Sequence, residues 1–351
     1  MNQPVVSISH TNLRHNVRRL VNVASPSGVM LAVKTNAYGH GLVEVSQTAI
    51  GAGVTALAVL EVTAGVTLRQ TGIDVPIFAW LLGDEDDYRL ASQHDIDLGI
   101  SSLHELELSA GAMTATTPLA VHLKIDTGLT RNGASENEWP GLCARAADLE
   151  AAGRIVVRGI WSHLADASPE DDAASLEIFN RAVDVATRTG LSPRVFHLGA
   201  SSAGLRFPES RMDFVRFGIA AYGVSPFDDA SAADLDVRPV MTVTAPVVRN
   251  ESGVLVVAAG FGHGILVGDH PDRFVTLNGH ECRVLNVDVD FMRVVPHVNL
   301  GPHFDALVGQ AVTIFGEGGP SAELLGSWCD TIGDEVLTSV SSRLPRVHVS
   351  N

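Results

Sequence analysis

The sequence is poor in cysteine, in aromatic residues and in basic residues. Its three cysteines lie far apart in 351 residues, and an odd, scattered set does not indicate the disulfide framework of a small secreted protein. We therefore expect a protein of the reducing cytoplasm. Lysine and arginine total 24 against 40 aspartates and glutamates, which gives a formal net charge of −16. Nucleic acids and anionic membranes would be repelled by this charge, so we expect neither as a partner.

Long apolar runs are also missing. No run approaches the roughly 20 apolar residues that a bilayer-spanning helix needs. The N-terminal segment lacks the basic-then-apolar order of a signal peptide. A chain of 351 residues, 46% of them apolar, instead predicts a large globular core divided between two domains.

Short apolar runs alternate with helix-length segments through the first two thirds of the chain. Residues 11–24 place Leu13, Val17, Leu20 and Val21 on one face of a predicted helix. Eight runs have the character of buried strands, at residues 29–33, 55–60, 75–80, 96–100, 121–125, 156–161, 194–198 and 214–223. Repeated βα units of this number predict an α/β fold, the (β/α)8 or TIM barrel. A doubly wound open sheet is the competing fold, but no GxGxxG follows the first strand, which disfavours a dinucleotide-binding domain.

From about residue 235 the sequence becomes β-rich with little helical period. The predicted strand regions are residues 240–248, 254–259, 274–295 and 311–315. Asn278 and Gly279 between apolar runs predict a two-residue hairpin turn. We expect a barrel domain over residues 1–230 and a mainly antiparallel β domain over residues 231–351, with a linker at residues 226–236.

Reactive side chains follow the predicted barrel strands. In this fold the catalytic groups lie beyond the C-terminal ends of the strands. The residues at these positions are Lys34, Tyr38, Lys124, Arg131, His163, His197, Ser201, Arg216, Gly218 and Ile219. A lysine at the end of a buried strand is costly as a bare ammonium, and its neutral amine is a nucleophile suited to a Schiff base. The strand ends therefore predict one active site with Lys34 at its centre.

The segment AVKTNAYGHG at residues 32–41 resembles the cofactor-lysine signature of the alanine racemase family. Further segments resemble this family in order and spacing, at residues 122–133, 159–167, 196–209, 214–223 and 331–347. The resemblance covers nearly the whole chain. It implies a barrel joined to a β domain, pyridoxal 5'-phosphate at the barrel mouth, a small amino acid as substrate and a head-to-tail homodimer.

The resemblance also implies a role for each residue at the barrel mouth. Lys34 would carry the cofactor, and Arg216, supported by His197, would face the pyridine nitrogen. A guanidinium does not readily give up its proton, so that nitrogen would stay unprotonated. The phosphate would be held by Tyr38, Ser201, Gly218 and Ile219, with His163 beside the cofactor ring. Arg131 would position the substrate carboxylate, and Lys124, often carbamylated in the family, would hold Arg131. No metal is expected.

One segment departs from the family pattern. The family's second base is a tyrosine of the partner subunit in a Gly-Tyr-x-Asp-Gly segment, which here has Phe261 and His263 at the tyrosine and aspartate positions. Phenylalanine has no transferable proton, whereas histidine is an ordinary acid–base near neutral pH. Other departures lie nearby: Ala200 replaces an asparagine, Ser342 replaces a phosphate-binding tyrosine, and Val289 replaces a methionine beside the retained, substrate-side Asp290.

Three functions remain open from the sequence. The first is a pyridoxal-phosphate-dependent amino-acid racemase or epimerase with Lys34, His263 and Arg131 as catalytic residues. The second is a one-base enzyme on the same scaffold, a decarboxylase, an aldol-type lyase or an eliminase, which would need Lys34 alone. The third is a non-catalytic cofactor-binding protein, against which the second domain and Arg131 both count.

Overall fold

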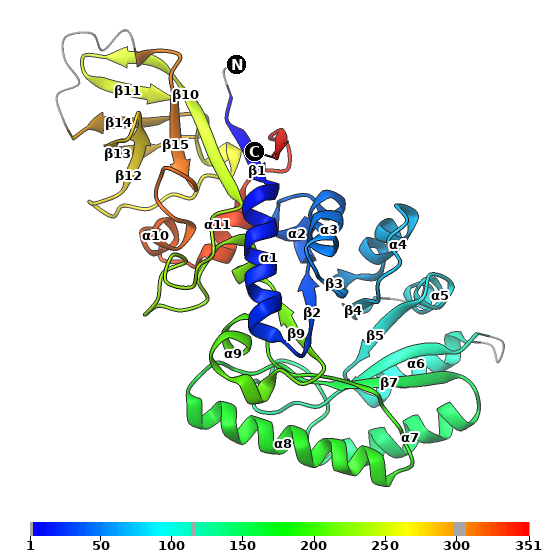
Figure 1. Cartoon of the computed structure of the whole chain (residues 1–351). Helices are drawn as coiled ribbons and strands as arrows, with labels where there is room; N and C mark the ends of the chain where they lie inside the picture. The colour runs from blue at the N-terminus through cyan, green and yellow to red at the C-terminus, as the bar shows by residue number, and fades with distance from the viewer. Residues whose placement is uncertain (1–2, 84, 114–116, 298–306, 351) are drawn as a thin grey trace. The chain divides into compact units, whose positions relative to one another are not determined.

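The computed structural model describes residues 3–83, 85–113, 117–297 and 307–350. Its chain divides into two compact units (Figure 1). One unit comprises Val17–Lys34 and Leu42–Gly218, and the other comprises Met1–Asn16, Thr35–Gly41 and Ile219–Asn351. Among the described residues, no helix is long and apolar enough to cross a bilayer.

The first unit is a (β/α)8 barrel. Its eight parallel strands neighbour one another in the order β8-β7-β6-β5-β4-β3-β2-β9. Their bounds are β2 Gly28–Ala32, β3 Ala56–Glu61, β4 Ile77–Leu81, β5 Ile96–Ile100, β6 Leu119–Lys124, β7 Ile155–Trp161, β8 Val195–His197 and β9 Phe214–Phe217. Backbone bonds close the seam between β8 and β9, where Asp213 N donates to Phe196 O and Arg216 N to Gly199 O, both at 3.0 Å. The predicted TIM barrel is confirmed.

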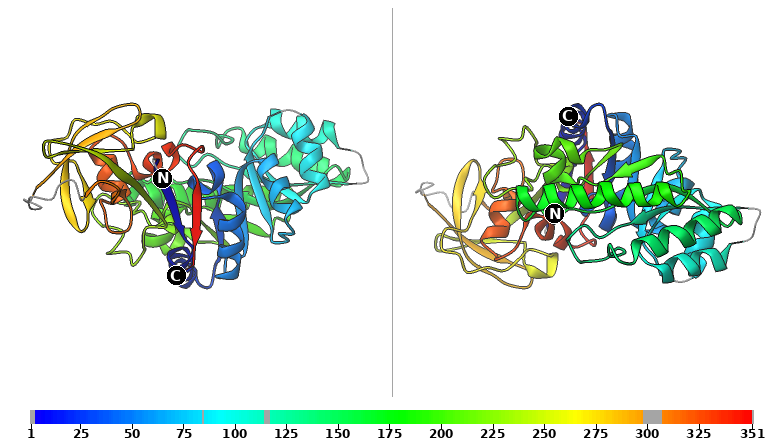
Figure 2. Two further views of the ribbon diagram at one scale, coloured as in Figure 1. Left: turned by 90° about the horizontal axis from the view of Figure 1, so that it is seen from above. Right: turned by 90° about the horizontal axis from the view of Figure 1, so that it is seen from below.

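Helices alternate with these strands along the chain. They are α1 His10–Ala24, α2 Lys34–Tyr38, α3 Leu42–Gly51, α4 Val62–Gln70, α5 Glu85–Gln93, α6 Leu103–Ala112, α7 Trp139–Ala151, α8 Pro169–Arg188 and α9 Ser201–Arg206. The longest, α8, starts where Ser168 accepts a bond from Asp171 N and Pro169 takes the first helical position. It lies beside α7 (Figure 2, right). The helix predicted over residues 11–24 is α1.

The second unit is built on a mainly antiparallel sheet. Its strands are β1 Val5–Ser9, β10 Met241–Glu251, β11 Val254–Val257, β12 Phe274–Leu277, β13 His280–Val287, β14 Met292–Pro296, β15 Ala311–Phe315 and β16 Arg346–Val349. Six of them form a closed ring because β11, which pairs with β14, also pairs with β10. Two helices, α10 Ala322–Ser327 and α11 Gly333–Ser339, follow β15. The predicted hairpin turn joins β12 to β13, with Asn278 and Gly279 at φ 52° and 79° as a type I′ turn requires.

Strand β1 was not predicted from the sequence. It pairs antiparallel with β10 and parallel with β16, and Figure 2 (left) shows the dark blue first strand beside the red last one. The contacts therefore group the first 16 residues with the β unit, whereas the predicted barrel domain began at residue 1. A second difference concerns the run predicted as one strand at residues 214–223. Strand β9 ends at Phe217, and Ile219–Tyr222 forms a 3-10 turn.

Candidate active site

Lys34 follows β2 after one residue and opens a strained turn. The four residues Thr35, Asn36, Ala37 and Tyr38 have φ values of 52° to 55°, in the left-handed region that costs an L-residue about 1–2 kcal/mol. Backbone bonds hold this turn closed, including Gly39 N to Thr35 O at 2.9 Å. Strain of this kind concentrates at functional sites. The half-buried Lys34 is thus followed by a turn with little freedom.

Tyr38 and His40 end this turn inside the β unit. The Nδ1 atom of the fully buried His40 donates to Ala37 O at 3.0 Å and to Tyr38 O at 2.9 Å. Burial lowers the pKa of His40 to about 4, so its ring is neutral at pH 7. Burial, together with the charge of Asp334, raises the pKa of Tyr38 above its ordinary value. Tyr38 therefore stays protonated, and its O–H can donate a hydrogen bond to an anion.

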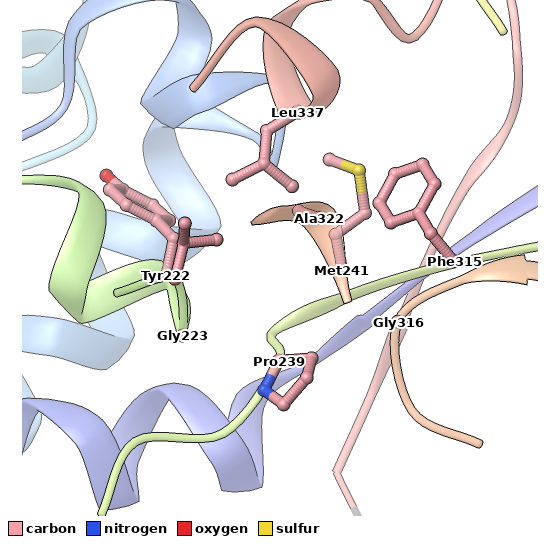
Figure 3. A pocket seen from close by; sticks show the side chains of 9 residues that line it. Tyr222, Gly223, Pro239, Met241, Phe315, Gly316, Ala322 and Leu337 are labelled. Atoms are coloured by element: carbon pink, nitrogen blue, oxygen red, sulfur yellow. The ribbon is translucent and has the colours of Figure 1, made fainter. Parts of the chain in front are cut away.

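A small pocket lies next to Tyr222, whose ring centroid is 4.7 Å from that of Tyr38. Figure 3 shows Met241, Phe315 and Leu337 among its lining side chains. Tyr222 contributes the one side-chain oxygen of this lining. Because polar groups do not converge here, we interpret the pocket as a packing gap of the β unit and not as an anion site.

Four cationic side chains surround His163 at the mouth of the barrel unit. Burial, followed in order of effect by the charges of Arg216, Arg131, Lys124 and Lys34, lowers the pKa of His163 to about 2. Such a concentration of positive charge favours a bound anion. The barrel mouth can therefore hold a phosphate and a carboxylate.

Arg216 on β9 is fixed by five hydrogen bonds. Its NH1 donates to His197 Nδ1 at 3.0 Å and to His197 O at 2.9 Å. Its NH2 donates to Ser162 O at 2.7 Å, Leu198 O at 3.0 Å and His163 Nδ1 at 3.2 Å. None of the described residues accepts a bond from Nε. Burial lowers the pKa of Arg216 to about 9, which leaves the guanidinium charged at pH 7 with one N–H available to a ligand.

Ser201, at the start of α9, pairs with the backbone that follows β9. Gly218 N donates to Ser201 Oγ at 3.1 Å. The residue before Ser201 caps α9 without a side-chain bond because it is Ala200, where the family has asparagine. Because Ser201 Oγ accepts this bond, its own O–H proton is available to donate to a phosphate oxygen.

Lys124 ends β6 in a nearly closed environment. Its Nζ donates to Asn132 Oδ1 and lies 4.5 Å from the centroid of the Trp161 ring. Burial and then the charges of Arg216 and Arg131 lower the pKa of Lys124 to about 8. A fraction of this amine is therefore neutral at pH 7.

In the β unit, the segment Gly260–Gly264 keeps the family's two outer glycines for a steric reason. A Cβ at Gly260 would lie 2.2 Å from Asp288 O, and one at Gly264 would lie 2.0 Å from Ser339 O. The side chain of Phe261 between them is 49% exposed. The backbone of this segment is thus held in place around an exposed aromatic side chain.

His263 caps its own turn. Its Nδ1 accepts from Gly260 N at 3.2 Å, so the neutral ring carries its proton on Nε2. The loop with Asp290 lies beside this turn, because Gly262 N donates to Val289 O at 2.8 Å. The closing segment lies there too, because Ser341 N, next to Ser342, donates to His263 O at 3.0 Å.

The structure places the predicted site residues in both units. The barrel unit holds Lys34, Lys124, Arg131, His163, His197, Ser201, Arg216 and Gly218, whereas the β unit holds Tyr38, Ile219, His263 and Asp290. Two residues were not predicted from the sequence. His122 hydrogen bonds to His197, and Asp97 hydrogen bonds to His122. The available signal was Asp97 inside the apolar run IDLGI and His122, two residues before Lys124, inside VHLKI.

The fold and these residues define a class. They are those of an enzyme that binds pyridoxal 5'-phosphate on a lysine at the mouth of a (β/α)8 barrel joined to a β domain. The donor set fits this cofactor: the Ser201 hydroxyl, in the positive field of the barrel mouth, suits its phosphate, and the Arg216 Nε–H suits its ring nitrogen.

The chain belongs to the alanine racemase family. A family model described as "Alanine racemase, N-terminal domain" matches residues 8–226, and one described as "Alanine racemase, C-terminal domain" matches residues 244–348. The chain is 34% identical to the alanine racemase of Beutenbergia cavernae, over 95% of the chain and 94% of that enzyme. It is 33% identical to that of Thermobifida fusca over the same shares of the two chains.

Solved structures agree. The alanine racemase from D-cycloserine-producing Streptomyces lavendulae matches with a TM-score of 0.92 at 30% identity, covering 100% of this chain and 98% of that one. The alanine racemase from Streptomyces coelicolor A3(2) matches with a TM-score of 0.92 at 31% identity, covering 99% and 98%. The protein is a pyridoxal-phosphate-dependent, racemase-like isomerase.

Proposed function

We propose that the protein interconverts the two enantiomers of a small amino acid, and that alanine is that amino acid. The observation that carries the proposal is the match of both domains to alanine racemases over 95% of the chain. When bound, the cofactor makes the α-proton of the amino acid removable by withdrawing electrons from the α-carbon. The residues of the chain bind, orient and exchange the proton.

Lys34 holds the cofactor and exchanges the proton on one face of the α-carbon. Its position directly after β2, ahead of the left-handed turn, supports this role. Tyr38, Ser201, Gly218 and Ile219 bind the phosphate. His163 lies beside the ring, and its lowered pKa keeps it neutral there.

Arg216 faces the ring nitrogen and does not protonate it. Its lowered pKa, about 9, is still well above neutral. The charged guanidinium would donate a hydrogen bond to the ring nitrogen without giving up a proton, which would limit the electron withdrawal that the bound cofactor supplies.

Arg131 binds the substrate carboxylate, and Asp290 contacts the substrate from the β domain. We assign to Lys124 the task of holding Arg131. With a pKa of about 8, its neutral amine can add to carbon dioxide with loss of one proton. The resulting carbamate would turn a neighbouring cation into an anionic partner for Arg131.

His263 of the partner subunit serves the opposite face. Its turn occupies the position of the family's tyrosine segment, and it carries the remaining acid–base group, because Phe261 has none. A ring that accepts from Gly260 N at 3.2 Å must leave that bond when Nδ1 takes up a proton. Proton exchange at His263 therefore includes a rotation of its side chain.

A one-base enzyme on the same scaffold is the second candidate. The half-exposed Phe261 at the position of the second base favours it. Lys34 alone would then exchange a proton or promote bond cleavage on one face.

The active unit is a homodimer in the cytoplasm. The exposed Phe261 and Val289 on adjacent segments support an interface there, and the cysteines, which are free thiols, suit a reducing compartment. We also retain residues 1–230 and 231–351 as the domains along the chain, because the two family models meet between residues 226 and 244.

Exchange of the α-proton in deuterated water tests the function. Single enantiomers of alanine are incubated with the holoenzyme and followed by NMR and chiral chromatography. We expect the wild type to form the opposite enantiomer, His263→Ala to lower its rate by about 10²–10⁴-fold, as for loss of a general base, and Phe261→Tyr to raise it. His280→Ala, on the exposed end of β13, is the control and should match the wild type.

Two results would contradict this proposal. A racemisation rate unchanged by His263→Ala would remove the assigned acid–base from the second face. Exchange with retention of configuration, or cleavage of a substrate bond, would establish the one-base reaction instead. Borohydride reduction of the holoenzyme checks the first face separately, because the fixed cofactor should map to the peptide that contains Lys34.

A further inference from the structure

A line of polar side chains crosses the interior of the barrel unit from Arg216 to its other end. His197 Nε2 lies 2.8 Å from His122 Nδ1, and His122 Nε2 lies 3.1 Å from Asp97 Oδ2. The other oxygen of Asp97, Oδ1, accepts from Arg158 NH1 at 2.6 Å. Together with the bond from Arg216 to His197, these contacts form one unbroken chain.

The two ends of this chain impose the same direction on every bond. A guanidinium can only donate, so His197 Nδ1 accepts and the proton of that ring is on Nε2. A carboxylate can only accept, so His122 Nε2 donates to Asp97, and His122 Nδ1 is left to accept from His197. Arg216 and Asp97 therefore select the same tautomer of both histidines.

Buried side chains and a glycine of the barrel pack closely around these hydrogen-bonded residues. His197 is fully buried and His122 is 2% exposed. A Cβ at Gly159 would lie 2.7 Å from His122 Nδ1, so any other residue there would displace the ring. Trp161 stacks on His197 at 5.7 Å between centroids, and Phe78 meets it edge-on at 5.0 Å.

A buried carboxylate and two buried imidazoles are expensive unless every donor and acceptor is paired. An apolar barrel core would avoid that cost. This hydrogen-bonded series also places the negative charge of Asp97 on the far side of His122 from His197, which is neutral at pH 7. Burial and the charge of Arg216 lower the pKa of His197 well below its ordinary value.

We propose that Asp97 is a positioning residue of the active site: through His122 it fixes the tautomer of His197 that accepts from Arg216, and so holds Arg216 in its orientation toward the cofactor. The inference rests on the proposed role of Arg216. It assigns a function to two residues, Asp97 and His122, that contact neither cofactor nor substrate.

Asp97→Asn tests the proposal with almost no change of volume. The amide presents one oxygen and one NH2 group, so it cannot accept from both His122 and Arg158. Residue 97 then no longer selects one tautomer of His122 and, through it, of His197. We expect the 15N signals of His197 to shift toward a mixture of tautomers, and kcat for l-alanine to fall about 10- to 100-fold with little change in KM, the usual range for residues that orient a ligand-binding side chain.

Asp95→Asn is the matched control. Asp95 pairs with the same Arg158, 3.2 Å away, but from an exposed position before β5, and its substitution removes the same charge. We expect its His197 signals, kcat and cofactor absorbance to equal those of the wild type. His122→Phe is a second variant, which removes the ring nitrogen that accepts from His197 and should shift the His197 signals and lower kcat in the same direction as Asp97→Asn.

The outcomes separate the inference from the proposed function. Wild-type His197 signals and kcat in Asp97→Asn would overturn the inference, and so would shifted signals with unchanged kcat and cofactor absorbance. If the wild type does not racemise any amino acid, the proposed function fails, and the His197 signals with the cofactor absorbance of Asp97→Asn still decide whether Asp97 acts through Arg216. An insoluble Asp97→Asn protein leaves His122→Phe as the test, with wild-type His197 signals and wild-type kcat contradicting the proposal.

Discussion

His40 shows how a single buried side chain makes stability depend on pH. Its Nδ1–H is bonded to two carbonyl groups of the left-handed turn, and burial lowers its pKa to about 4. In the unfolded chain the same ring titrates near 6.5. Between these two values the unfolded state binds more protons than the folded state, so acid favours unfolding.

We therefore expect the stabilisation from a neutral His40 to be complete above about pH 6.5 and to be lost as the pH falls to about 4. The full effect is on the order of 3 kcal/mol. Urea-unfolding midpoints of the holoenzyme at about pH 5 and pH 7.5 measure it. His40→Asn retains a donor for the two carbonyl groups but does not titrate, so its midpoint should change less between these pH values.

The exposed His104→Gln serves as the comparison and should follow the wild type at both pH values. An equal pH dependence in His40→Asn would show that the acid sensitivity arises elsewhere, for instance from His163 or His197, whose pKa values are also lowered.

At the residue scale, a functional side chain that follows a strand is easier to recognise from the sequence than a functional side chain within a strand. The segment around Lys34 could be recognised because the ten residues AVKTNAYGHG resemble a known signature. Asp97 and His122 carry no such signature, and their meaning depends on parallel neighbours that bring them to 3.1 Å. His263 could be identified as a candidate, but its bond to Gly260 N follows only from the turn geometry.

At the scale of elements, the left-handed turn after Lys34 contains four consecutive residues with a positive φ. Thr35 is the least suited of its residues, because a β-branched side chain tolerates a φ of 53° poorly. Asparagine adopts this region more readily. We expect Thr35→Asn to stabilise the protein by roughly 0.5–1 kcal/mol and to raise the thermal midpoint of the holoenzyme by about 1–2 °C.

Thr67→Asn provides the matched substitution in an ordinary helix. Thr67 is exposed within α4, where the two residue types have similar helix propensities. Its midpoint should stay within about 0.5 °C of the wild type, since exposed substitutions rarely have large effects. A lower midpoint for Thr35→Asn would mean that the turn is not strained at this residue.

The elements of the barrel could be predicted because each buried strand is a short apolar run between helix-length segments. The run 96–100 and strand β5 coincide, and the other seven differ at their ends. Strand β1 escaped prediction because its five residues pair with strands more than 230 positions away, a relation that local pattern does not contain. The overlong run 214–223 contains Gly218, where the chain leaves the sheet for a 3-10 turn.

At the scale of the whole molecule, the exposed apolar side chains beside the His263 turn are the surface where we expect a second subunit to bind. Phe261 is 49% exposed and Val289 is 51% exposed. If this surface meets a second subunit, Val289→Arg should weaken the dimer, because a buried unpaired charge is costly. Sedimentation velocity over a range of concentrations should show dissociation in the variant, and its specific activity should fall on dilution.

Val156→Arg introduces the same change at a 39% exposed position on β7. We expect it to leave both the dimer and the activity unchanged. A wild-type protein that is monomeric and fully active at high dilution would exclude an active site shared between subunits.

The position of β1 between β10 and β16 has a consequence for how the protein is made. Val5–Ser9 leave the ribosome before the barrel strands and pair on one side with Arg346–Val349, which leave it after them. During synthesis the first strand therefore has an unpaired edge while the barrel strands are already able to pair. The nascent chain has to keep this edge from aggregating, so an N-terminal fusion partner that shields it should increase soluble yield more than a C-terminal one.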